Sequence, residues 1–227
     1  MDSVIKSLSD AIYYNLIREQ RYMQFIQGLG ISLQLTLYAA ILGTVIGLFL
    51  ALAKLGRIKW LEGLATLYVD VIRGTPAVVQ LVLIYYAILG SSNLPKIVVA
   101  SVAFGINSGA YVCELIRAGI LAVDRGQMEA ARSLGFSYSH SMIYIIIPQA
   151  IKNILPALAN EFIVLLKETA IAGYIALDDL TRAGNIVRGR TFDAYTPFIV
   201  VALIYLYITT MLTWLLNKLE GRLRESD

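Results

Sequence analysis

The sequence has few charged residues: only 15% of its 227 residues are Asp, Glu, Lys or Arg, whereas soluble globular domains carry about 25%. Hydrophobic residues make up 58% of the chain. Charge of this amount cannot cover the surface of a water-soluble domain of that length, so the composition predicts a protein embedded in a lipid bilayer. The net charge of +3 is too small to indicate nucleic-acid binding.

Residues that form catalytic or metal centres are also scarce. The chain has one cysteine, Cys113, and one histidine, His140, which excludes an intramolecular disulfide and a multi-histidine metal site. Cys113 lies in an apolar run, where a small packing residue is expected. The serine-nucleophile motif Gly-x-Ser-x-Gly is absent. We therefore predict no catalytic residues, no metal ligands and no cofactor in this chain.

Apolar runs long enough to cross a membrane occur along most of the sequence. A spanning helix needs about 20 mostly apolar residues, and the candidate spans are residues 24–53, 61–89, 94–120, 151–174 and 195–216. The second, third and fourth runs contain charges, whereas the first and fifth do not. This contrast predicts an outer pair of helices that faces lipid and an inner trio that lines something polar. The expected fold class is an all-α membrane protein with five transmembrane helices.

The segments outside these runs predict the remaining organisation. Residues 1–22 mix both charges with apolar positions, unlike a cleaved secretory signal, so we expect an amphipathic helix on the membrane surface. Residues 23–219 then form the transmembrane domain, and residues 220–227 form a cytoplasmic tail. The first loop carries Lys54, Arg57 and Lys59, and the positive-inside rule therefore favours an outside N-terminus and a cytoplasmic C-terminus.

Two glycine-containing patterns resemble known motifs, one for helix packing and one for phosphate binding. Gly43 and Gly47 are four residues apart in the first run, which favours close packing of two helices in lipid. The segment from Gly184 to Thr191 nearly matches a phosphate-binding loop, but Arg190 replaces its lysine and no hydrophobic strand precedes it. We therefore predict no nucleotide site there.

The segment 126–150 interrupts the apolar pattern with an amphipathic stretch. Ala131 and Leu134 recur at helical spacing, and Gly135 follows as a helix stop. A second short helix then leads to Pro148, with three serines as candidate caps: Ser137, Ser139 and Ser141. The pattern predicts a helix, a turn and a helix outside the bilayer, within a loop over residues 123–150. This loop is either an ordinary connection or a surface that docks on another protein.

The spacing within this loop resembles a known signature. Glu129-Ala130-Ala131, three residues, Gly135, nine residues and Ile145-x-Ile147-Pro148 resemble the loop of ATP-binding-cassette importer permeases, with isoleucine in place of leucine at position 147. In that family the loop forms coupling helices that dock on a cytoplasmic ATPase subunit. The resemblance implies this coupling role for five residues: Glu129, Ala130, Ala131, Gly135 and Pro148.

Further motifs resemble the polar amino acid uptake branch of the same family, over residues 28–180. They are Tyr68 to Pro76 (YVDVIRGTP) with Gln80, Gly109 to Arg117 (GAYVCELIR), Gly126-Gln127, Pro148-Gln149-Ala150, Asn160-Glu161 and Lys167-Glu168-Thr169. Ala170 departs from the serine that the branch usually shows.

The resemblance implies a permease subunit of an ATP-driven importer in a prokaryotic cell membrane. Its implied partners are ATPase subunits that bind ATP and magnesium, an extracytoplasmic amino acid binding protein, and a second permease, either a copy or a close homologue. No nucleic acid is implied.

Charges inside spanning helices cost about 2.5–3.5 kcal/mol each and usually mark function. Asp70 and Arg73 are three residues apart and share a helix face. Pro76 cannot donate to the carbonyl of Ile72 and Gly74 loosens the same turn, and freed backbone groups are tolerated where they line a cavity. The candidate substrate-binding residues are Asp70, Arg73, Gly74, Thr75, Gln80, Tyr111, Glu114, Asn160 and Glu161.

Several readings of these charges remain open. One reading is internal pairing of Glu114 with Arg73 or with Arg117 inside the bundle. The acids Asp70, Glu114 and Glu161 outnumber Arg73, which favours a basic amino acid such as arginine, lysine or histidine, with a neutral one such as glutamine as the alternative. An ion-coupled secondary transporter would need two similar halves or more spans, and the sequence shows no internal repeat. A structural scaffold would require neither buried charges nor a docking loop.

Overall fold

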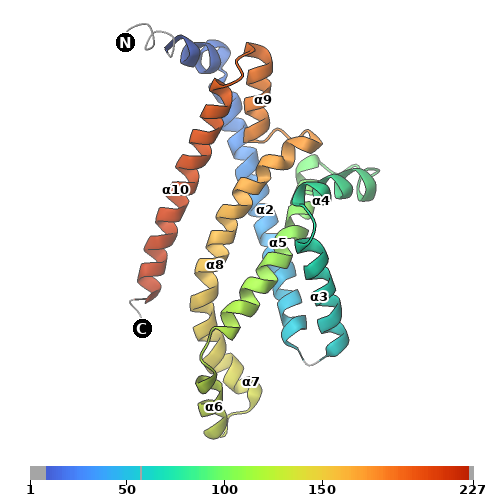
Figure 1. The fold of residues 1–227 in the computed structure, drawn as a ribbon, viewed down its shortest axis with the longest axis vertical. Coiled ribbons are helices and arrows are strands. Elements are labelled where there is room, and N and C mark those ends of the chain that lie inside the picture. Colours follow the sequence, from blue (N-terminus) through green and yellow to red (C-terminus); the bar gives the residue numbers. More distant parts are fainter. Residues whose placement is uncertain (1–8, 57, 225–227) are drawn as a thin grey trace.

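The computed structural model describes residues 9–56 and 58–224, and this part of the chain is helical, without strands. The long helices run side by side in an elongated bundle (Figure 1). The N-terminal segment lies at one end of the bundle with α9 (Leu180–Thr191), while α6 (Arg125–Ser133) and α7 (Tyr138–Ser141) project at the other end.

The spanning helices agree with the sequence prediction. They are α2 (Tyr22–Leu55), α3 (Lys59–Arg73) continued by α4 (Ala77–Leu83), α5 (Lys96–Leu121), α8 (Ile147–Glu168) and α10 (Thr196–Arg224). By length and composition, four helical segments of the described chain are able to cross a membrane, or five if the bent pair α3–α4 counts as one span. The sequence did not predict α9, which we expected as part of an external loop. The division into domains stays a prediction.

Helix α5 is the central helix, and this corrects one prediction. Of the 18 most apolar consecutive residues of each helix, 67% are buried in α5, compared with 33% in α2 and 6% in α10. Helix α2, expected to face lipid with α10, packs along α5. A Cβ atom built on Gly47 would lie 2.6 Å from the Cβ atom of Val112, and one on Gly43 would lie 2.8 Å from that of Ser108. The lack of charge in α2 therefore reflects close packing as well as lipid contact.

The second span is broken. Helix α3 ends at Gly74, and α4 begins after Pro76, whose ψ of 135° is extended. The two parts are bent by 103° relative to each other. A π-helical turn, Ile84–Ile88, continues α4. The predicted loosening at Gly74 and Pro76 is thus a sharp bend, because proline can neither donate the next backbone hydrogen bond nor leave room for the preceding carbonyl.

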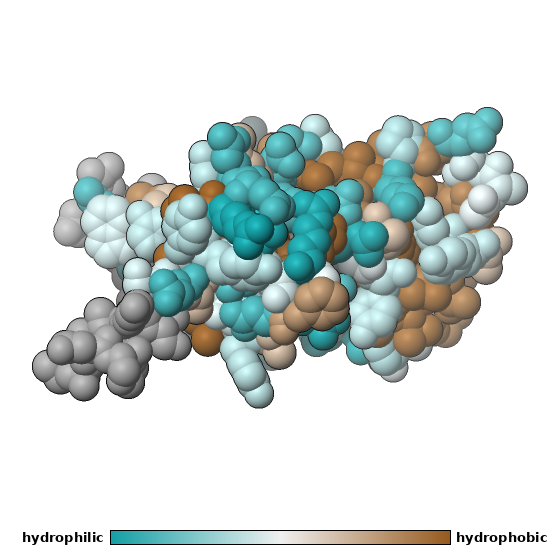
Figure 2. Space-filling model, turned by 90° about the horizontal axis from the view of Figure 1, so that it is seen from above, coloured by the Kyte–Doolittle hydropathy of each residue, from teal (hydrophilic) through white to brown (hydrophobic). Residues whose placement is uncertain are grey.

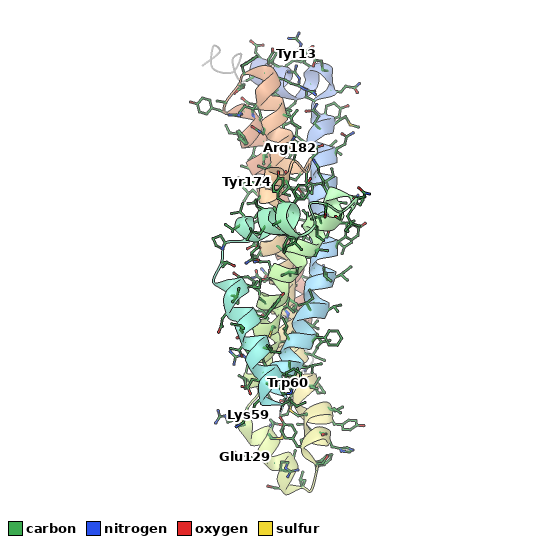
Figure 3. The ribbon with its side chains drawn as sticks, turned by 90° about the vertical axis from the view of Figure 1, so that its right-hand side faces the viewer. Tyr13, Lys59, Trp60, Glu129, Tyr174 and Arg182 are labelled. Carbon is green, nitrogen blue, oxygen red and sulfur yellow. The ribbon has the colours of Figure 1, made fainter. Side chains whose placement is uncertain are left out.

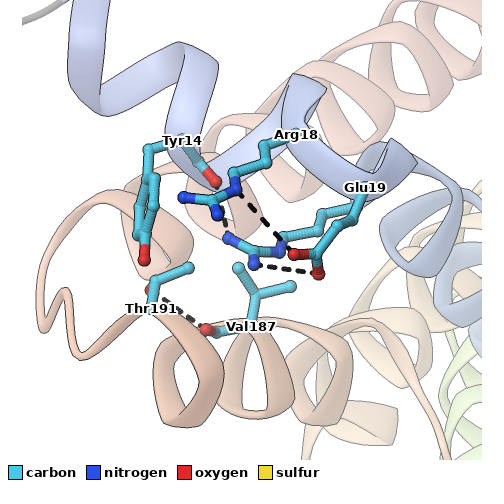
Figure 4. A network of polar contacts seen from close by, with 6 residues as sticks. Tyr14, Arg18, Glu19, Val187 and Thr191 are labelled. Atoms are coloured by element: carbon cyan, nitrogen blue, oxygen red, sulfur yellow. Dashed lines mark hydrogen bonds and ion pairs between the residues drawn. The ribbon is translucent and has the colours of Figure 1, made fainter.

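The N-terminal segment packs beside α9. Residues 1–8 of the predicted surface helix lie outside the described residues, and residues 9–20 form helical turns that end where Glu19 and Gln20 adopt positive φ angles. Arg21, which is buried, donates from Nη1 to the carbonyl oxygen of Tyr14 (2.7 Å) and from Nη2 to Glu19 (3.0 Å) (Figure 4). A break therefore separates this segment from α2.

An aspartate fixes the other side of this segment. Asn15 Nδ2 donates to Asp193 Oδ2 at 2.8 Å, and the backbone N–H groups of Tyr195 and Thr196 donate to Asp193 Oδ1. Burial raises the pKa of the Asp193 carboxyl, but the hydrogen bonds donated by Thr196, Tyr195 and Asn15 lower it more, to about 2. The carboxylate therefore stays ionised, and continues to accept these bonds, at all physiological pH values.

The close approach of α2 and α5 predicts the effect of one substitution. We expect Gly47→Leu to lower the free energy of unfolding by about 1–3 kcal/mol, because the new side chain has no space against Val112. The matched control is Gly30→Leu in the same helix, where a Cβ atom meets nothing within 4 Å. Thermal melting of the purified chain measures both changes. Equal melting temperatures for the two variants would contradict the packing.

Candidate substrate pathway and coupling surface

The break in the second span is held by the side chain of Gln80, which is 7% exposed. Its Nε2 lies 2.7 Å from the carbonyl oxygen of Ile72, 3.1 Å from that of Thr75 and 2.7 Å from Thr75 Oγ1. Ile72 is the residue whose carbonyl Pro76 cannot serve, so the side-chain amide replaces the missing backbone donor. Oε1 of Gln80 accepts from Asn107 Nδ2 at 3.0 Å. The bend is thus fastened to α5.

The residues at the end of α3 and in the break itself are exposed. Asp70, Arg73, Gly74 and Thr75 are all exposed. The Arg73 guanidinium lies 5.2 Å from the centre of the Tyr111 ring on α5, a distance typical of a cation–π contact. Arg73 therefore does not pair with Glu114, one of the two pairings considered from the sequence. Within residues 9–56 and 58–224, no acceptor takes a hydrogen bond from its guanidinium, which has five N–H donors.

Glu114 is held by two cations. Lys54 Nζ lies 2.7 Å from Glu114 Oε1, and Arg117 donates to Oε2 from Nη2 at 2.8 Å and from Nε at 3.0 Å. The pairing with Arg117 is the other one considered from the sequence. The contact with Lys54 was not expected, because that lysine was assigned to the loop after α2. These bonds brace the end of α2 against α5. A substrate contact for Glu114 stays a prediction.

Glu161 has a different environment. It is half-buried on α8, and Ser108 Oγ on α5 donates to its Oε1 at 3.3 Å. No basic side chain of residues 9–56 and 58–224 forms an ion pair with it. Asn160, the preceding residue, is exposed. Of the three predicted acids, Glu114 is paired, whereas Glu161 and the exposed Asp70 form no ion pair within the described residues; Glu161 is the half-buried one of these two.

The loop 123–150 has the predicted helix, turn and helix. The Asp124 carboxylate accepts from the backbone N–H of Gly126 at the start of α6, and Ser137 Oγ accepts from that of His140 at the start of α7. Gly135 between them has a φ of +90°, which favours glycine because other residues carry a Cβ atom that clashes there. Of the three candidate caps, Ser137 is the one that caps α7. The turn thus has the conformation predicted from Gly135.

The second helix of the loop continues into the membrane. A π-helical turn, Met142–Ile146, links α7 to α8, and Pro148 occupies the first turn of α8. Proline is tolerated at this position because first-turn N–H groups have no partner within the helix. The fourth span thus begins earlier than the predicted residue 151. The loop is therefore joined to α8 by continuous helix.

The tip of the loop exposes apolar side chains. Leu134 is 79% exposed and Phe136 is 40% exposed, and with Gly135, Ser137 and His140 they line a hollow of about 450 Å³. Glu129 lies at this far end of the molecule (Figure 3). Exposed apolar groups outside the spans mark a surface for another protein. We define Glu129, Ala130, Leu134, Gly135 and Phe136 as the coupling surface.

Two of these positions differ from the sequence-based expectation. Leu134 was expected to share an apolar helix face with Ala131, but only Ala131 is buried, at 2% exposure. Ala131 is therefore small because the loop packs against itself at this point, whereas Ala130 is exposed. The sequence analysis did not include Leu134 and Phe136 among the candidate coupling residues. Their position on either side of the helix-ending Gly135 is the signal that could have pointed to them.

The chain combines spanning helices, one of them broken beside charged residues, with a helical loop that projects beyond the bundle. These features are those of an integral-membrane transport subunit. Comparison with known proteins identifies its family. The model of the binding-protein-dependent transport system inner membrane component matches residues 43–225. The chain belongs to this family, and it is a permease of an amino acid ATP-binding-cassette transporter.

Its relatives carry different substrate names. The arginine transport system permease protein ArtQ of Bacillus subtilis is 39% identical over 89% of this chain and 93% of its own length. The putative glutamine transport system permease protein GlnP of Rickettsia bellii is 40% identical over 87% of this chain and 92% of its own length.

Solved structures share the fold. An amino acid ABC transporter with histidines has 48% sequence identity and a TM-score of 0.86, covering 91% of this chain and 97% of that chain. The inward-facing methionine transporter MetNI, at 18% identity and a TM-score of 0.72 over 89% of this chain and 97% of that chain, shows likeness of fold alone.

Substitution of Gln80 tests whether its contacts hold the break in the second span. Gln80→Leu removes the donor shared by the carbonyl groups of Ile72 and Thr75. We therefore expect the free energy of unfolding to fall by about 1–3 kcal/mol and amino acid uptake to be lost. The neighbouring Val79, which is 46% exposed, offers a matched control as Val79→Leu. Melting temperature and uptake into reconstituted vesicles are the measurements. Normal uptake by Gln80→Leu would show that the bend does not depend on this amide.

Proposed function

We propose that this permease imports basic amino acids, namely arginine, lysine or histidine. The observation that carries the proposal is the half-buried carboxylate of Glu161, which faces α5 without a basic partner in the described chain. A buried acid without a counter-charge favours a ligand that brings a positive charge. The 39% identical relative named for arginine and the 48% identical transporter described with histidines support the same substrate class.

Both charges of the substrate have candidate partners. The substrate carboxylate binds Arg73, whose planar guanidinium can donate two parallel hydrogen bonds, or the backbone near Gly74 and Thr75. The side-chain cation binds Glu161. Two exposed polar residues are further candidate contacts: Asp70, three residues before Arg73, and Asn160, next to Glu161. The remaining candidates shape the site: Tyr111 holds Arg73, Gln80 holds the break, and Glu114 holds α2 against α5.

We infer that a separate cytoplasmic ATPase, which binds ATP and magnesium, drives transport by docking on the coupling surface. The cations at the junction of α2 and α3, among them Lys54 at the end of α2 and Lys59 at the start of α3, support the cytoplasmic assignment of this end. The end with α9 then faces outward, where an amino acid binding protein delivers substrate. A second permease, a copy or a close homologue, completes the pathway beside the exposed Asp70 and Arg73.

A neutral polar substrate is the second candidate. Relatives about as similar as the arginine permease are named as putative glutamine permeases. Lys54 and Arg117 offset the charge of Glu114, which leaves fewer free acids than the sequence suggested. A glutamine side chain would donate its amide hydrogens to Glu161 with no requirement for net charge.

Substitution of the free acid distinguishes the two candidates. We expect Glu161→Gln to weaken competition by arginine by about tenfold or more, the effect of losing about 1.4 kcal/mol of charge attraction, and to weaken competition by glutamine far less. Uptake of labelled substrate into vesicles with the reconstituted transporter measures both. Glutamine that competes as well as arginine against the unmodified transporter would overturn the proposal of basic cargo.

The coupling surface has its own test. Glu129→Ala and Leu134→Arg should abolish ATP-driven uptake while membrane insertion and the melting temperature stay normal, because both side chains are exposed. Gly189→Arg is the control at the opposite end, an exposed position where a Cβ atom meets nothing within 4 Å. Co-purification of the ATPase subunit gives the binding readout. Full uptake by both loop variants would remove the docking role.

A further inference from the structure

An apolar groove lies between the first part of α2 and the first part of α10. It encloses about 600 Å³, within the range of about 300–1,000 Å³ typical of ligand pockets. Its main lining residues are Tyr22, Phe25, Ile26, Leu203, Ile204 and Tyr207. These side chains offer almost no hydrogen-bonding groups apart from two tyrosine hydroxyls. The groove therefore fits an occupant that is apolar along its length.

The length of the groove limits what that occupant is. On α2 its lining extends from Tyr22 to Leu29, and on α10 from Val200 to Ile208, which at 1.5 Å per residue is about 10–12 Å of helix. The hydrocarbon core of a bilayer is about 30 Å thick. The groove is thus confined to one leaflet, on the side of the N-terminal segment. An acyl chain of a lipid in that leaflet has the matching chemistry and direction.

A cation lies close in sequence to the groove lining. The Arg18 side chain is 52% exposed, and Arg18 Nε is 3.8 Å from Glu19 Oε1, which is a weak contact. Glu19 Oε2 instead accepts the shorter bond of 3.0 Å from Arg21. Arg18 lies 5.0 Å from the centre of the Tyr14 ring (Figure 4). Within the described residues, no hydrogen bond occupies the terminal nitrogens of Arg18.

Aromatic residues place this cation at the level of lipid headgroups. Tyr13, Tyr14 and Tyr22 are exposed in the same segment, and exposed tyrosines concentrate where a membrane meets water. Polar residues gather at this end of the molecule (Figure 2). A guanidinium at this level is suited to a phosphate, whose oxygens match its paired donors.

The groove is formed before anything binds. Leu16 lines it, and it lies between two fixed points of the N-terminal segment: Asn15, bonded to Asp193, and Arg21, bonded to the carbonyl of Tyr14. Because these contacts hold Leu16 against the helices, a ligand meets little cost of ordering the segment.

From this arrangement we propose that the groove and Arg18 bind one phospholipid of the leaflet at the N-terminal end. One acyl chain lies between α2 and α10, and the phosphate accepts hydrogen bonds from Arg18. A second copy of the chain is the rival occupant. It is less favoured, because a partner helix would need no phosphate-binding cation such as Arg18, which follows the lining residue Leu16 by two positions in the sequence.

The test compares two leucines of α10. Leu203, 58% exposed, lines the groove, whereas Leu206, 62% exposed, does not. The full chain is purified in detergent, phosphatidylglycerol is added, and native mass spectrometry measures the fraction of chains that retain one lipid. We expect Leu203→Trp to lower this fraction about fivefold or more, because the ring fills the groove, and Leu206→Trp to leave it unchanged. Arg18→Gln should also lower it, by about threefold or more.

Three results would overturn the proposal. The first is lipid retention by Leu203→Trp at the level of the unmodified chain. The second is retention by Arg18→Gln at that level, which would remove the phosphate contact. The third is a dimer without bound lipid that dissociates in Leu203→Trp, which would identify a second copy as the occupant.

Discussion

The carbonyl group of Ile72 has no backbone donor, because Pro76 stands where that donor would be. In lipid such a group must be satisfied within the protein, and the Gln80 amide does this at 2.7 Å. The contact spans the sharp bend between α3 and α4. Arg73 lies exposed at the end of α3, beside this bend. Through Asn107, the same amide joins the broken span to α5.

Helix α5 connects the break to the coupling loop. Along its length it carries Asn107 bonded to Gln80, Ser108 bonded to Glu161, and Glu114 bonded to Lys54. The loop that begins at residue 123 follows α5 directly and continues into α8. The loop is therefore connected directly to the two helices that carry Asn107, Ser108 and Glu161. Close packing against α2 limits bending of α5 along the way.

Charge is distributed unequally along this path. Near the coupling loop, Glu114 is braced by two cations, so its contribution is geometric: it joins the ends of two helices. Nearer the break, Arg73 and Glu161 keep free capacity for a ligand of both charges. This division places the paired charges near the coupling loop and the unpaired charges beside the break, where the substrate is proposed to bind.

The sequence by itself determined what depends on local pattern: the spans, because about 20 apolar residues suffice to cross lipid; the weakness at Pro76; and the turn at Gly135. It also identified the candidate site residues, because charged and polar side chains stand out within apolar runs. The tertiary structure decided which of them meet. The sequence could not place α2 against α5, pair Lys54 with Glu114, or turn Leu134 outward, because each depends on the approach of helices far apart in the chain. Helical periodicity tells which residues share a face, but only packing decides what that face meets.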